Sequence, residues 1–259
     1  MRRVKAGPGF IDVCSKEGCD GPLRTVFSTV AGPSESLLGD LRRPFTLAGL
    51  AVAVALAMPE LLTSLPMVGG AFRVVYLAAL SGYYFRIVEH VGRGREGLPG
   101  PSDAFEDAWT LIRDVARGVV CALVALAPII VWLVLDRRAG EMLERGSLAP
   151  LALVFIGLAL APAAILGVVL TRSTIGAVWP VTWIRIVSRA PISYLRLVAL
   201  FLAAGVVWAT VGRLASLLFG RIPFLGEALE ATALNLVVFL QAALVGGFVR
   251  RNADELGYE

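Results

Sequence analysis

Six long apolar stretches divide this chain, and short connections that carry arginine separate them. Three of the stretches contain no charged side chain over the length of a helix, at residues 118–135, 149–170 and 231–249. A helix needs about 20 mostly apolar residues to cross a bilayer. The pattern therefore predicts membrane-spanning helices, and the stretches are roughly 44–65, 67–88, 115–135, 149–171, 193–218 and 224–249.

Segments inside lipid must satisfy their own backbone hydrogen bonds, which favours helices. The stretches are too long and too evenly apolar for barrel strands, whose residues alternate in polarity. Glu60 and Arg73 interrupt the first two stretches, which we interpret as two helices joined near Pro66. The predicted fold class is all-α, a polytopic membrane helical bundle of about six transmembrane helices. A soluble helical protein is disfavoured because almost no polar face would remain.

Composition agrees with this class. The chain is 57% hydrophobic and 17% charged, with a mean hydropathy of +0.77. Soluble domains are closer to about 45–50% apolar and about 25% charged. The net charge of +4 is expected to serve orientation and contact with anionic lipid, because no basic patch for nucleic acid is evident.

Arginine and lysine lie mostly on one side of the predicted membrane. With the N-terminus inside, the inner segments hold eighteen of these residues and the outer connections hold five. By the positive-inside rule, both termini are expected in the cytoplasm, in a bacterial inner membrane. Residues 1–40 show no apolar core of a cleavable signal, so we expect the first span to act as an uncleaved insertion signal.

Two segments at the predicted inner surface are amphipathic. In residues 103–117, Phe105, Trp109 and Ile112 share one helical face. We expect this segment to lie in the interface before turning into the third span, and residues 176–195 to form a similar elbow. The predicted organisation is a loosely ordered cytoplasmic segment, a six-helix domain and a cytoplasmic tail, at 1–36, 37–251 and 252–259.

Motifs for chemistry are scarce. Residues 92–97 spell the dinucleotide-binding pattern, but a membrane helix precedes them where that site needs a strand, so a basic surface turn is the favoured interpretation. Cys14 and Cys19 are too few for a structural zinc site within one chain, and whether they bind metal stays open. His90 is the only histidine. We therefore expect no catalytic residue, no cofactor and no metal.

Ionisable groups at membrane depth are the best functional pointers, because they are rare there. Arg213 is placed to pair with Glu227 or Glu230, and Glu60 with Arg73. We expect mainly ion pairs that lock helix ends, with a solute or proton path as the alternative. The candidate polar face consists of Glu227, Glu230, Asn235, Gln241 and Arg213.

One region resembles a known family. Its motif residues are Gly82, Tyr83, Arg86, Gly97, Leu98 and Pro99, followed by an acidic and aromatic run at 103–109. This order is similar to that of bacterial membrane proteins of the domain of unknown function 4013 family. A Pro- and Tyr-bearing segment at 179–194 resembles the second half of that family. The resemblance covers roughly 37–250, and it implies a topology without implying a mechanism.

Three functions follow as hypotheses. The leading one is a non-enzymatic scaffold or accessory protein that acts at the inner membrane surface, with membrane lipids and other membrane proteins as partners. The alternative is a small-solute transporter or channel-like bundle, which the polar face of the sixth span favours. A lipid-acting membrane enzyme is the third, and it would need a water-accessible site near His90.

Overall fold

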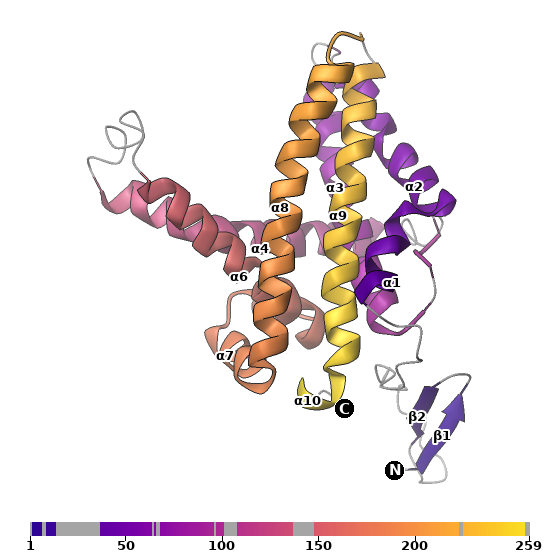
Figure 1. The fold of residues 1–259 in the computed structure, drawn as a ribbon, viewed down its shortest axis with the longest axis vertical. Coiled ribbons are helices and arrows are strands. Elements are labelled where there is room, and N and C mark those ends of the chain that lie inside the picture. The colour runs from indigo at the N-terminus through magenta and orange to yellow at the C-terminus, as the bar shows by residue number, and fades with distance from the viewer. Residues whose placement is uncertain are drawn as a thin grey trace.

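The computed structural model is helical almost throughout (Figure 1). It describes residues 2–6, 9–13, 37–63, 65, 68–95, 97–100, 108–136, 148–222 and 225–256. The long helices are α2 (Leu47–Ala57), α3 (Gly69–Gly92), α4 (Ala108–Leu135), α6 (Ala149–Thr171), α8 (Pro191–Phe219) and α9 (Leu225–Arg251). The short elements are β1 (Arg2–Ala6), β2 (Gly9–Val13), α1 (Leu37–Arg42), η1 (Arg43–Phe45), η2 (Met58–Leu62), η4 (Thr174–Ala177), α7 (Pro180–Arg189) and α10 (Ala253–Leu256).

Five of the described helices are long and apolar enough to cross a membrane, namely α3, α4, α6, α8 and α9. A sixth span is present if the bent pair Gly39–Phe45 and Leu47–Leu62, with its 54° angle, counts as one. Thr46 lies at the bend in an extended conformation, and its side chain accepts a hydrogen bond from the Gly49 amide. The prediction of an all-α membrane bundle with about six spans is confirmed, and the chain is a multi-pass membrane protein.

Helix α9 is the central element of the bundle. It packs against α8 on one side and against α2 and α3 on the other (Figure 1). Residues 242–250 are all buried. At Gly246 an added Cβ would lie 2.8 Å from the Val88 carbonyl oxygen, so the backbones of α9 and α3 touch there. Small residues permit such close approach between membrane helices.

Helices α4 and α6 form a hairpin that leans sideways from α8 and α9 (Figure 1). The two helices approach closely at Gly157, where a Cβ would lie 1.8 Å from the Ala125 carbonyl oxygen. Apolar side chains on α4 are exposed, Val134 and Leu135 at 76% and 77%. Such a surface suits contact with lipid, since proteins in water rarely expose large contiguous apolar patches.

The two ends of the bundle differ, and we name them by α9. The basal end carries the C-terminus of α9 together with α1, α7 and α10, and it lies at the bottom of Figure 1. The apical end carries η2 and the start of α9. A predicted inner-surface elbow is present at the basal end, where α7 begins at Pro180 and α8 at Pro191.

The other predicted elbow does not form a separate helix. From Ala108, the amphipathic sequence continues into the third span as the single helix α4. The expected turn is therefore wrong within the described part, because no Pro or paired Gly interrupts the helix before Pro128. Residues 103–107, which begin that elbow, lie outside the described residues.

The terminal segments contain short elements. Strands β1 and β2 pair antiparallel, with Val4 opposite Ile11, in a segment expected to be loosely ordered. The β-branched residues and the Gly-Pro sequence between the strands favour a hairpin. Residues 14–36, with Cys14 and Cys19, lie outside the described part. In the predicted tail, α10 buries Leu256.

Candidate functional site

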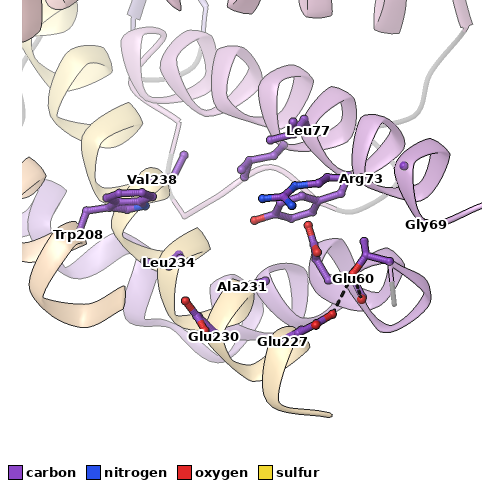
Figure 2. Close-up of a pocket in the computed structure, with 14 residues that line it drawn as sticks. Glu60, Gly69, Arg73, Leu77, Trp208, Glu227, Glu230, Ala231, Leu234 and Val238 are labelled. Atoms are coloured by element: carbon purple, nitrogen blue, oxygen red, sulfur yellow. Dashed lines mark hydrogen bonds between the residues drawn. The ribbon is translucent and has the colours of Figure 1, made fainter. Parts of the chain in front are cut away.

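The apical end contains a cavity of about 720 Å³ between η2, α3, α8 and α9 (Figure 2). Its wall carries most of the ionisable groups of the apical end. The lining residues are Glu60, Thr63, Gly69, Gly70, Arg73, Tyr76, Leu77, Leu80, Trp208, Glu227, Glu230, Ala231, Leu234 and Val238.

Three elements, α3, α9 and η2, position the charged side chains. Arg73 stands on the second turn of α3, and Glu227 and Glu230 are three residues apart on the first turns of α9, so they share a face. Glu60 comes from η2, which follows the last turn of α2 and has Pro59 as its second residue. Thr63 follows η2 and donates a hydrogen bond of 2.9 Å from its Oγ1 to Oε2 of Glu227. The same hydroxyl lies 2.7 Å from the Glu60 carbonyl oxygen, so Thr63 links the Glu227 carboxylate to the end of η2.

A buried hydrogen-bond chain lies on the inner side of the cavity. The Tyr76 hydroxyl donates to Oδ1 of Asn235 at 2.8 Å, and the Asn235 amide nitrogen donates to the Ala53 carbonyl at 3.1 Å. Asn235 is fully buried. The three residues stand on α3, α9 and α2, so the chain ties these helices together where the cavity ends. Buried polar groups in a membrane need such partners.

The cavity is acidic. Three carboxylates face one guanidinium, so the formal charge of the lining residues is −2. The expected ion pairs do not form among the described residues: Glu60 and Arg73 line the same cavity without a salt bridge, and Arg213 is exposed and pairs with neither Glu227 nor Glu230. Arg73 of α3 and Glu60 of η2 both project into the cavity (Figure 2).

The candidate polar face is divided between three places. Glu227 and Glu230 line the cavity. Asn235 lies in the hydrogen-bond chain at its inner side. Gln241 is half-buried further along α9 and is not a lining residue, and Arg213 projects from α8 outside the cavity. Residues that point in the same direction from α9 have different surroundings, because the neighbours of this helix change along its length.

Sequence reasoning missed two aromatic members of the cavity. Tyr76 follows Arg73 by three residues and therefore lies on the same face of α3. Trp208 stands in the middle of α8, away from the helix ends where membrane tryptophans usually gather. The sequence contains a signal for each residue. Tyr76 is an aromatic residue close to a charged one within a span, and Trp208 is a tryptophan in the middle of a span.

Two residues of the motif at 82–99, Tyr83 and Pro99, are in contact at the basal end and hold a loop. The Tyr83 hydroxyl donates to the Pro99 carbonyl at 2.8 Å, and both residues are buried. At the other end of the loop, Arg43 donates to the Arg95 carbonyl at 2.6 Å. Gly97 has a φ of 75°, a conformation that favours glycine. Within the pattern at 92–97, Gly92 is the last residue of α3, and residues 93 and 94 form a turn after it.

A buried charge cluster lies beside this loop. Asp40 is fully buried, and its carboxylate faces Arg43 and Arg250 at 3.4 Å and Arg251 at 2.5 Å. The three arginines offset the cost of removing the Asp40 carboxylate from water. The cluster joins α1 and η1 to the C-terminus of α9, so it fixes the basal end and does not open on the apical cavity.

Comparisons with protein-family models, with curated proteins and with solved structures give no match. The resemblance to the domain of unknown function 4013 family therefore stays a prediction. The apical cavity is the candidate site on its geometry alone.

Proposed function

We propose that this membrane protein binds a small organic cation in the apical cavity and catalyses no reaction. The observation that carries the proposal is the convergence of Glu60, Glu227 and Glu230 on one cavity with a single arginine. Carboxylates at membrane depth attract a positive charge more strongly than they would in water, because the surroundings are less polar. This is the binding step of the solute-transporter hypothesis.

The cavity wall favours an organic cation over a bare metal ion. Among the described residues, no three acidic, histidine or cysteine side chains lie close enough together to hold one metal. Trp208 and Tyr76 supply aromatic surface instead. A cation over an aromatic face gains about 0.5–2 kcal/mol. Quaternary ammonium ions combine the required charge with the required size.

The test is a titration of the purified protein with tetramethylammonium and tetraethylammonium, followed by tryptophan fluorescence. We expect saturable binding that Glu230→Gln weakens about tenfold, which corresponds to about 1.4 kcal/mol. Trp208→Phe should remove most of the fluorescence change. Gln241→Ala is the matched control, because it changes a polar residue of the same helix outside the cavity. Equal affinities for Glu230→Gln and Gln241→Ala would contradict the proposal.

Transport requires a second experiment. Liposomes that contain the protein are loaded with labelled tetraethylammonium, and its release is compared with that from empty liposomes. Release that Glu230→Gln abolishes supports a transporter. Binding without release supports a receptor or accessory protein that takes up the cation from one side only.

A second candidate function is the accessory role at the membrane surface. The observation that favours it is α7, whose Val181 and Ile184 are 52% and 67% exposed while Arg185 and Arg189 stand on the same short helix. Amphipathic helices of this kind lie in the interface plane. If Ile184→Glu leaves expression intact but abolishes co-purification of a protein partner, the accessory role gains support.

We place the protein in a bacterial cytoplasmic membrane with both termini inside, as a member of the family that its motif resembles. The support is the excess of arginine and lysine in the segments on the side of the termini. The buried contact between Tyr83 and Pro99 gives the motif a physical role, which is to hold the loop after α3. A fluorescent or enzymatic reporter fused to the C-terminus tests the orientation.

A further inference from the structure

A second charged cleft, of about 400 Å³, opens at the basal end between α8 and α9. It lies at the other end of these helices from the apical cavity. Leu37 of α1 and Glu255 of α10 stand at its edges. The lining residues are Leu37, Ser193, Arg196, Leu197, Leu200, Leu244, Phe248, Arg251, Asn252 and Glu255.

Both walls of this basal cleft change from polar to apolar in the same direction. On α8, Arg196 stands near the basal start of the helix and Leu200 one turn further in. On α9, Arg251 stands at the basal end and Leu244 about 10 Å further in, at 1.5 Å of rise per residue. A charged head and an apolar chain in one molecule would match this gradient.

The charges favour an anion. Arg196 is exposed, and it has no hydrogen-bond or ion-pair partner within the described ranges. Arg251 is oriented by its bond to Asp40. The charged lining residues are Arg196, Arg251 and Glu255, so the formal charge of the lining is +1.

We infer that the basal cleft binds an anionic phospholipid, with its phosphate between Arg196 and Arg251 and one acyl chain along Leu200 and Leu244. Basic pockets between membrane helices at one surface bind such head groups. A soluble phosphate would satisfy the two arginines but would leave the apolar half of the cleft without a ligand. The inference does not depend on the proposed cation binding, because the two sites share no residue.

The test uses the full chain in nanodiscs of phosphatidylcholine with a minor share of phosphatidylglycerol. After gentle extraction, native mass spectrometry counts the phosphatidylglycerol that each protein retains. We expect Arg196→Gln to lower the retained amount about fivefold, the value of one arginine near a membrane surface. Arg213→Gln is the matched control, since Arg213 is an exposed arginine of the same helix outside the cleft. Its retention should equal that of the unchanged protein.

A second variant separates the chain-binding half from the charged half. Leu200→Trp fills the apolar part and leaves both arginines in place, so it should also lower retention. An excess of inorganic phosphate is added in a parallel sample and should displace little lipid. Equal retention by Arg196→Gln and Arg213→Gln overturns the inference. Full displacement by phosphate, with no effect of Leu200→Trp, overturns the lipid assignment in favour of soluble phosphate.

Discussion

Gly247 has no side chain at the point where the carboxylate of Asp40 lies. A Cβ at this position would be 2.1 Å from Oδ2 of Asp40 and 2.8 Å from its Cγ. The glycine therefore admits the carboxylate to the surface of α9, where Arg250 and Arg251 reach it. The missing side chain of Gly247 on α9 and the charge of Asp40 on α1 together hold α1 against α9.

Asp40→Asn should destabilise the protein by about 3 kcal/mol, because it removes the negative member of a buried charge cluster and leaves buried guanidinium groups behind. The midpoint of thermal unfolding in detergent measures the effect. Glu255→Gln is the control, since Glu255 is an exposed carboxylate at the same end of the bundle. Equal midpoints for the two variants would show that the cluster contributes nothing.

Gly247→Ala should also destabilise the protein, and its effect should depend on Asp40. In an Asp40→Ala background the carboxylate is gone and only the movable Arg251 side chain stays close to the added methyl, with Nη1 at 3.0 Å, so the cost should fall by about 1 kcal/mol or more. A double-mutant cycle from denaturant unfolding gives this coupling energy. Additive effects would mean that the new Cβ clashes with something other than the carboxylate.

Tyr83→Phe should loosen the loop after α3. The variant removes a buried hydrogen bond to the Pro99 carbonyl, at a cost of about 1 kcal/mol. Trypsin should then cut faster after Arg93 or Arg95. Tyr84→Phe is a matched control, because the buried Tyr84 hydroxyl has no hydrogen-bond partner in the described part of the chain. Faster cleavage in both variants would contradict the specific role of Tyr83.

Asn235→Leu and Tyr76→Phe should have non-additive effects. Both remove the same hydrogen bond between α9 and α3, and only Asn235→Leu also removes the bond to Ala53. We expect about 1 kcal/mol for Tyr76→Phe and somewhat more for Asn235→Leu, with the double variant close to Asn235→Leu alone. Unfolding of the three variants in one detergent checks this. A double variant that loses the full sum would exclude the shared bond.

Cysteine at position 230 should react with a charged thiol reagent that does not cross membranes. The experiment uses a background with Cys14→Ser and Cys19→Ser, and Val237→Cys is the buried control on the same helix. Reaction of Glu230→Cys in intact cells would place the apical end outside, in agreement with the charge distribution. Reaction only in broken cells would reverse the proposed orientation.

Most of the helical architecture could be predicted from the chain. The charge-free run at 149–170 became α6, and the run at 231–249 became the inner part of α9, because only a helix satisfies an apolar backbone in lipid. The predicted elbow at 176–195 contains α7, which begins at Pro180 and is followed by α8 from Pro191. The first span was harder to define, since the bend at Thr46 depends on local capping that hydropathy does not report.

The tertiary contacts of the sites could not be predicted in the same way. Asp40 was one polar residue in a mixed segment, and its partner Arg251 is 211 positions away. Glu227 and Glu230 were found because charge is rare in a span. Their neighbours Trp208 and Tyr76 were missed because an apolar pattern does not say which helix packs beside which. The polar residues of one helix indicate which of its faces is special, whereas a cavity is formed by the faces of several helices together.

The separation between Asp40 and Arg251 has a consequence for biosynthesis. Helix α1 is synthesised long before α9. Of the three arginines around Asp40, only Arg43 is therefore present until about two hundred further residues have been made. Only the arrival of α9 completes its surroundings and brings α2, α3 and α8 onto a common partner. A nascent chain that stalls before α9 would therefore leave α2, α3 and α8 without their shared contact surface.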